Sequence, residues 1–348
     1  MERRNIGIDY VRCLMAILIM MYHYTYRYFE LFPSVSNKYM SHLKYGGTIG
    51  VAIFFVISSF YSMNTDYSDA KCSFVKKIIR LYPAYLLAVI IIYIVVKITN
   101  TVELEVSVLD LLMNIILIAR YLGRKLVDGA HWYVYFLIVF YAWHILLNKL
   151  GLKKKYWPYI VWLVLSSITS QSFMEHFGLN SIVYFNHRIE SLCTVLFLER
   201  YSSYIIIGVM IFFIVNKIGV FRKSITLLFV ALVRNIFFVP YSILIIITFL
   251  CVILFLMFSE YLVLPQNHIV NWFAPISYSF YLIHQNIGYV VFQFQKINSF
   301  GKWIVAICTA IGLSILLACF IDKVSIVMQR CIKNIIQRLR FKFTDEII

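Results

Sequence analysis

Apolar residues in this chain gather in long runs separated by short polar or basic connections. A membrane-spanning helix needs roughly 20 mostly apolar residues, and runs of about that length recur along the whole sequence. The pattern predicts an all-α, polytopic membrane bundle forming a single domain over 1–348, with a basic tail at 323–348. About ten spans are expected, at 8–29, 46–64, 81–98, 132–148, 157–171, 201–217, 224–239, 241–262, 273–293 and 303–322.

The stretch from Val106 to Ala119 is apolar but short, and it contains Asp110 and Asn114. Counting it as a span would put the basic tail outside, against the tendency of Lys and Arg to stay on the cytoplasmic side. We therefore expect an interfacial or re-entrant segment on the outer side, with both chain termini in the cytoplasm. The first apolar run is too long for a signal core and lacks a small-residue cleavage site, so it is expected to remain as a span.

Composition supports a membrane location, because 62% of the 348 residues are hydrophobic and only 14% are charged. Soluble domains are about half apolar and about a quarter charged. The net charge of +16 comes from basic residues in short loops, where they set topology, so we expect no nucleic-acid partner. The seven cysteines show no metal-ligand spacing, and neither disulfides nor a bound metal are expected.

Three ionisable residues lie along the first predicted helix: Asp9, Arg12 and His23. At 100° per residue, Arg12 and His23 fall within roughly 20° of each other and about 16 Å apart. One interpretation is a path from a cytoplasmic donor to a base, because His can remove a hydroxyl proton near neutral pH. The other is structural: an Asp9–Arg12 pair at the interface, with His23 bonded to a neighbouring Tyr.

Two other groups of polar residues also have both a functional and a structural interpretation. Lys76, Lys77 and Arg80 share one helical face and could bind phosphates, or they could only mark topology. In the ninth predicted span, Ser277, Tyr281, His284 and Gly288 recur at helical spacing and form a second polar stripe. Ionisable groups inside membrane spans are energetically costly. Because His23 and His284 lie on separate predicted helices beside polar stripes, a functional cavity is favoured over two structural histidines.

Four stretches together resemble the acyltransferase-3 family of membrane O-acyltransferases. They are Ile8-Asp-Tyr-Val-Arg-Cys-Leu-Met-Ala through His23, Gly50-Val-Ala-Ile-Phe-Phe-Val-Ile-Ser-Ser-Phe, Lys77-Ile-Ile-Arg-Leu-Tyr-Pro-Ala-Tyr and Ser277-Tyr-Ser-Phe-Tyr-Leu-Ile-His. Tyr204-Ile-Ile-Ile-Gly-Val-Met is similar to a weaker motif of the family. Their order and spacing extend through nearly the whole chain.

The resemblance implies transfer of an acyl group, commonly acetyl from cytoplasmic acetyl-CoA, to a hydroxyl of a surface or lipid-linked glycan at the bacterial cytoplasmic membrane. It makes His23 the catalytic histidine, with Arg12 as its essential partner. Asp9, Ser277, Tyr281 and His284 are expected to support them, and Lys76, Lys77 and Arg80 to face the CoA phosphates. The outer segment with His187, Arg188 and Glu190 is a candidate acceptor contact.

The sequence departs from the family pattern at two places. Many members carry Trp-Ser-x-x-x-Glu where this chain has His131-Trp-Tyr-Val-Tyr-Phe-Leu, so an acidic helper must come from elsewhere, with Glu190 as one candidate. Ser59 stands where Gly is usual, and no soluble C-terminal domain is expected. The alternative function is a transporter or flippase for a lipid-linked glycan, which the absence of internal repeats disfavours. A non-catalytic scaffold would not need buried Arg12, His23 and His284.

Overall fold

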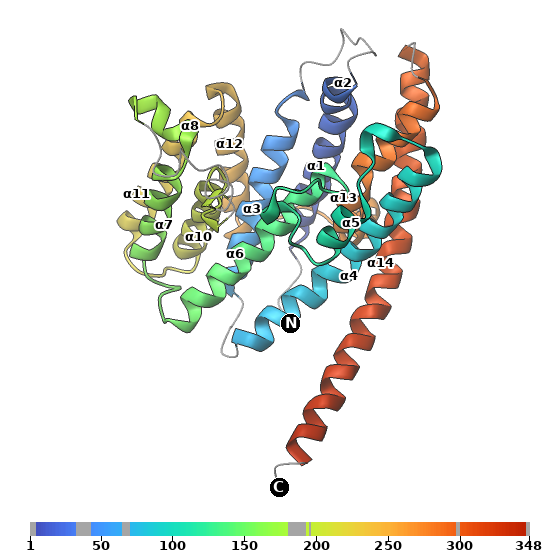
Figure 1. Cartoon of the computed structure of the whole chain (residues 1–348). Helices are drawn as coiled ribbons and strands as arrows, with labels where there is room; N and C mark the ends of the chain where they lie inside the picture. Colours follow the sequence, from blue (N-terminus) through green and yellow to red (C-terminus); the bar gives the residue numbers. More distant parts are fainter. Residues whose placement is uncertain are drawn as a thin grey trace.

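The computed structural model describes residues 5–32, 43–64, 70–179, 193, 194, 196–296 and 300–345, and every regular element in these ranges is helical. Figure 1 shows the helices packed as one bundle. The longer helices are Ile6–Tyr22 (α1), Gly46–Asn64 (α3), Ala70–Thr99 (α4), Val108–Ile115 (α5), Trp132–Lys149 (α6), Trp157–Ile168 (α7), Ser202–Val215 (α10), Phe221–Arg234 (α11), Tyr241–Phe258 (α12), His268–Phe294 (α13) and Phe300–Asp345 (α14). The short helices are Tyr28–Leu31 (α2) and Gln171–Met174 (α8).

A helix occupies each of the predicted spans, which confirms the all-helical membrane bundle. In lipid the backbone must satisfy its own hydrogen bonds, and a helix does so within one segment. Within the described part of the chain, six helical stretches are long and apolar enough to cross a membrane: Ile6–Leu31, Gly46–Asn64, Phe74–Thr99, Gly129–Lys149, Tyr241–Phe258 and Gly301–Ile336.

The other four predicted spans differ from a simple apolar helix. α7 has 12 residues and α10 and α11 have 14 each, so none reaches across a hydrocarbon core of about 30 Å at 1.5 Å per residue. α13 is long, at 27 residues, but it carries the stripe of Ser277, Tyr281 and His284. Its low apolar content therefore follows from the polar site that it supports.

The segment 106–119 does not form a span. It contains α5, eight residues long, whose first turn is fixed by a capping box between Ser107 and Asp110. Buried Asn114 accepts a hydrogen bond from Val127 N and donates to Lys125 O, which folds the α4–α6 connection back on itself. The interfacial or re-entrant form predicted for this segment fits an eight-residue helix, and its placement on the outer side stays a prediction.

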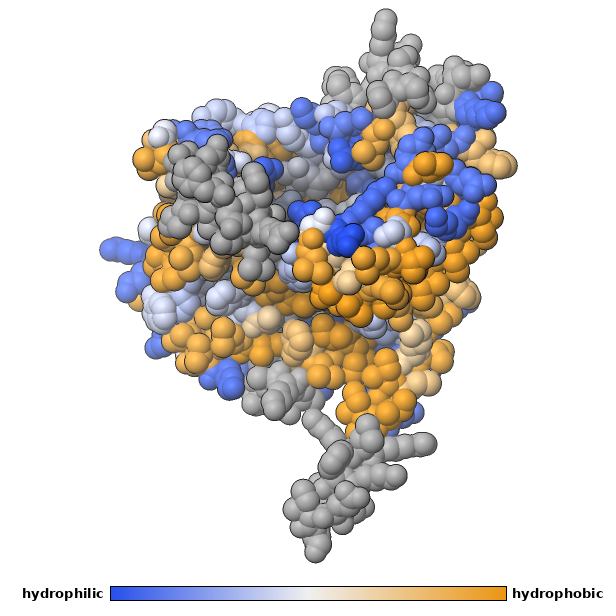
Figure 2. All heavy atoms as spheres, viewed as in Figure 1, coloured by the Kyte–Doolittle hydropathy of each residue, from blue (hydrophilic) through white to orange (hydrophobic). Residues whose placement is uncertain are grey.

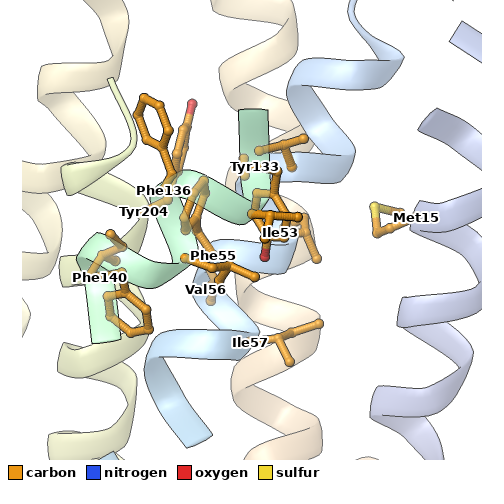
Figure 3. Packing of buried hydrophobic residues seen from close by; sticks show 14 of the residues in the cluster. Met15, Ile53, Phe55, Val56, Ile57, Tyr133, Phe136, Phe140 and Tyr204 are labelled. Atoms are coloured by element: carbon orange, nitrogen blue, oxygen red, sulfur yellow. The ribbon is translucent and has the colours of Figure 1, made fainter. Parts of the chain in front are cut away.

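The central core is built by helices from distant parts of the sequence. Figure 3 shows Met15 of α1, Phe55 and Val56 of α3, Phe140 of α6 and Tyr204 of α10 in one cluster of buried side chains. These side chains are all almost fully buried. α14 packs beside this bundle and continues below it, and α1 begins toward the same lower part of the view (Figure 1).

Ser59 fits at its close-packed position because the facing helix supplies a glycine. Its side chain donates to Val56 O at 3.0 Å, and a Cβ built at Gly208 of α10 would lie only 2.0 Å from Ser59 Oγ. Gly208 belongs to the Tyr204–Met210 motif. The departure at Ser59 is therefore accommodated by a missing side chain on the neighbouring helix.

We expect Gly208→Ala to destabilise the bundle by about 1–3 kcal/mol, because the added methyl overlaps both Ser59 Oγ and Val56 O. The measurement is the unfolding temperature of the detergent-solubilised chain. Gly312→Ala on α14 is the matched control, since nothing lies within 4 Å of its added Cβ. Equal unfolding temperatures for the two variants would contradict the packing described here.

Candidate active site

His23 opens a π-helical turn at the end of α1. The turn covers His23–Arg27, and the N–H of Tyr28 donates to His23 O, five residues back. π turns inside α-helices occur frequently at functional sites. The turn ends the regular α1 geometry at the histidine and leaves His23 half-buried and facing a cavity.

Two residues of α13 surround the His23 ring. Its Nδ1 lies 3.2 Å from Tyr289 Oη, within hydrogen-bond distance, and its centroid is 5.2 Å from that of His284 in an edge-on arrangement. A tyrosine partner for His23 was one of the two sequence interpretations, but that tyrosine comes from α13 rather than from the aromatic run beside His23. Tyr289 is therefore a site residue that the sequence did not predict.

Hydrogen bonds fix the tautomer of His284. Its Nδ1 lies 2.8 Å from Tyr281 O, and a carbonyl oxygen only accepts, so Nδ1 carries the proton. Nε2 of the neutral ring is then an acceptor, and it is buried without a hydrogen-bond partner among the described residues. Tyr24 Oη donates to His284 O at 2.8 Å, a contact that fits because Gly288 has no side chain.

The cavity beside His23, here called the His23 cavity, has a volume of about 870 Å³. Aromatic side chains from four segments line it: Tyr22, Trp132, Tyr201 and Tyr281. Trp132 and Tyr201 stack with their centroids 5.0 Å apart. Figure 2 shows hydrophilic side chains gathered around a hollow in the upper part of the face, near the α4–α6 connection.

A second cavity, here called the Arg12 cavity, has a volume of about 550 Å³. Arg12 of α1 and Lys77 and Arg80 of α4 line it, together with Asp322 and Gln329 of α14. Arg12 lies 3.6 Å from Asp9 in an ion pair and 5.5 Å from the ring centre of Tyr61. Lys77 Nζ lies 5.0 Å from the ring centre of Tyr141.

Tyr281 lines both cavities and thus stands between them. Its hydroxyl donates to Ala130 O at 2.6 Å, and its ring meets that of Tyr133 at 5.6 Å. A group that passes from one cavity to the other must therefore pass this side chain or displace it.

The predicted site residues divide between the cavities. Arg12, Asp9, Ser277, Lys77 and Arg80 line the Arg12 cavity, whereas His23 lines the other. Arg12 and His23 therefore line different cavities, and the functional partnership expected between them across about 16 Å stays a prediction. Lys76 is exposed and lines neither cavity. His187, Arg188 and Glu190 lie outside the described residues.

A buried carboxylate that the sequence analysis missed lies beside α13. Asp128 is fully buried, and its two oxygens accept hydrogen bonds from Ala130 N at 2.8 Å and Asn286 N at 3.0 Å. Burial raises the pKa of the Asp128 carboxyl to about 7, and these two N–H donors oppose the rise. Asp128 lies three residues before His131, which begins the stretch that departs from the family pattern. That departure was the sequence signal closest to Asp128.

His131 completes the junction with α13. Its Nε2 lies 2.8 Å from Leu282 O, so Nε2 carries the proton. Leu282 O and Asn286 N, which lie four residues apart on α13, each have a side-chain partner in this segment: His131 donates to the carbonyl and Asp128 accepts from the N–H. Asn286 Nδ2 also donates to Val127 O at 2.8 Å. Residues 127–131 are thereby held against the part of α13 that carries Tyr281 and His284.

Comparison with known proteins gives one match. The model of a family described as an acyltransferase domain matches residues 5–321, which include the whole described lining of the His23 cavity and that of the Arg12 cavity except Asp322, Ser325 and Gln329. No curated protein and no solved structure matches the chain.

We expect Asp128→Asn to destabilise the chain by about 1–3 kcal/mol. An amide offers one oxygen and would turn its N–H₂ group toward one of the two backbone donors, leaving that donor unpaired. The unfolding temperature of the solubilised chain measures the effect, with Glu260→Gln at an exposed loop as the control. An unchanged unfolding temperature for Asp128→Asn would show that this junction does not hold α13.

Proposed function

The chain belongs to the acyltransferase-3 family, and on that basis we propose that it moves an acetyl group from cytoplasmic acetyl-CoA to a hydroxyl of a cell-surface or lipid-linked glycan. We place the reaction at the bacterial cytoplasmic membrane. The observation that carries the proposal is a pair of cavities that share Tyr281 as a wall: one is lined by Arg12, Lys77 and Arg80, and the other by His23.

The Arg12 cavity is suited to the donor. CoA carries phosphates, and the guanidinium groups of Arg12 and Arg80 can bind them with two parallel hydrogen bonds, while Lys77 adds a point charge. Arg12 and His23 stand about 16 Å apart along α1. An extended pantetheine arm can lie along this distance and bring the thioester past Tyr281 to His23.

The His23 cavity is suited to the acceptor. Its walls combine the stacked pair of Trp132 and Tyr201 with polar groups, and such aromatic rings offer an apolar face with polar edges to a sugar ring. An acceptor hydroxyl at the His23 end would meet the thioester carbonyl there. Holding two reactants together in this way accounts for a large part of catalysis.

In the proposed reaction His23 acts as the general base. With Nδ1–H donating to Tyr289 Oη, Nε2 accepts the proton of the acceptor hydroxyl as its oxygen attacks the thioester carbonyl. The tetrahedral intermediate expels the CoA thiolate, and the imidazolium returns the proton to give CoA-SH and the ester.

The oxyanion of the intermediate needs a donor, and neutral His284 cannot supply one at Nε2. Tyr281 is the hydroxyl that both cavities share, so we assign it this role. Its proton would shift from Ala130 O to the developing oxyanion when the thioester is bound. Arg12, in the other cavity, acts on the donor rather than on His23.

We expect His23→Ala to lower acetyl transfer at least a hundredfold, because general-base catalysis contributes about 10²–10⁴-fold. Membranes containing the chain would be supplied with radiolabelled acetyl-CoA, and CoA thiol release and label in the glycans would be followed. His176→Ala, at an exposed histidine outside both cavities, is the matched control. Equal rates in the two variants, at equal protein levels, would refute the catalytic role and favour the flippase alternative.

Within the basic group of α4, we expect Lys77→Ala and Arg80→Ala to raise the KM for acetyl-CoA about tenfold each, since each loses a charged partner of a phosphate. Lys76→Ala, at the exposed neighbour, should leave that KM unchanged. With S-acetylpantetheine, which lacks the nucleotide, all three variants should behave alike. A similar rise for Lys76→Ala would mean that the group sets topology instead.

A further inference from the structure

Among the described residues that line the His23 cavity, the charged side chains are mostly basic. Arg27, Arg120, Arg124, Lys125 and Arg200 line it, against two carboxylates, Glu103 and Glu199. The proposed donor does not explain them, because its phosphates are assigned to the other cavity. These cations therefore need a separate explanation.

Three of the five basic groups already have partners within the protein. Arg27 pairs with Glu30, and Arg124 Nη1 lies 3.7 Å from Asp110 Oδ1. Lys125 Nζ donates to the backbone oxygens of Glu103 and Glu105 at 3.0 and 2.7 Å. Arg120 and Arg200, by contrast, make no hydrogen bond or ion pair with any described residue.

The predicted topology makes this basic group unusual. Short outer loops contain few Lys and Arg, since these residues collect on the cytoplasmic side. Four of the five cations lie in the connections before α6 and α10, which the topology places outside. Topology marking therefore does not account for them, and like charges around one cavity repel unless an anion joins them.

We propose that the acceptor glycan is anionic, carrying a carboxylate or a phosphate ester that Arg120 and Arg200 bind. The sugar bearing that group packs on Trp132 and Tyr201, and its neighbour presents a hydroxyl to His23. Guanidinium groups bind both kinds of anion through paired hydrogen bonds, so the cavity chemistry is shared by the two sources. This inference rests on the proposed function and names its substrate class.

In the experiment, membranes that contain the full chain are supplied with surface glycans from the cells in which the chain naturally occurs. The glycans are stripped of esters with mild alkali and separated by anion exchange into neutral and acidic pools. With radiolabelled acetyl-CoA, we expect label in the acidic pool at least tenfold above the neutral pool. Carboxyl reduction of one portion and phosphatase with mild acid on another show which anion is needed.

Variants then locate the binding groups. The double variant Arg120→Gln with Arg200→Gln should lower transfer at limiting acceptor about tenfold while the KM for acetyl-CoA stays unchanged. Arg222→Gln, an exposed arginine outside both cavities, should have no effect. Half-molar salt should weaken transfer in the parent chain more than in the double variant.

Two kinds of failure are distinguishable through thiol release. Three results would each overturn the anionic acceptor alone. They are label in the neutral pool, no label in the acidic pool despite His23-dependent thiol release, and a raised KM for acetyl-CoA in the double variant. If thiol release does not depend on His23, the proposed function itself fails, and the inference fails with it.

Discussion

The hydrogen bonds between residues 127–131 and α13 are the interaction on which the rest of the site depends. Asp128 accepts from Asn286 N and His131 donates to Leu282 O, and each such hydrogen bond contributes about 0.5–1.5 kcal/mol. The same contacts place Tyr281 against Ala130 O. Since Tyr281 and His284 lie within this junction, the wall between the cavities and the environment of His23 both follow from it.

The positions of Arg12 and His23 separate two tasks, donor binding and proton abstraction, that the sequence analysis assigned to one helix. Arg12 lies in α1 and His23 directly follows that helix, yet the two residues line different cavities, with Tyr281 lining both. Under the proposed function, each cavity holds one reactant and the chemistry occurs where they meet. A membrane enzyme that takes its donor from one side and its acceptor from the other needs an arrangement of this kind.

Much of the fold could be predicted because apolar length is a local property of the sequence. The helix over 46–64 and the stripe of Ser277, Tyr281 and His284 were both visible in periodicity. The shared cavity of Arg12, Lys77 and Arg80 was not predicted, because it depends on how α1 packs relative to α4. The short lengths of α7 and α11 were not, because neighbouring turns were counted into the spans.

The missed site residues depend on contacts between distant parts of the chain. Asp128 stands 158 residues from Asn286 and lies in an irregular segment whose path no periodicity describes. Tyr289 lies one position beyond Gly288, off the polar stripe, and meets His23 only because α1 and α13 pack together. Ser59 also depends on such a contact: the departure from the usual Gly is matched by Gly208 on another helix.

An experimental structure of the chain with S-acetonyl-CoA, a ketone analogue that has no thioester to cleave, would show whether donor and acceptor meet between the two cavities. We expect the nucleotide phosphates to lie beside Arg12, Lys77 and Arg80, the arm to pass Tyr281, and the carbonyl carbon to lie next to His23 Nε2. A nucleotide bound in the His23 cavity, or a carbonyl that stays on the Arg12 side of Tyr281, would contradict this expectation.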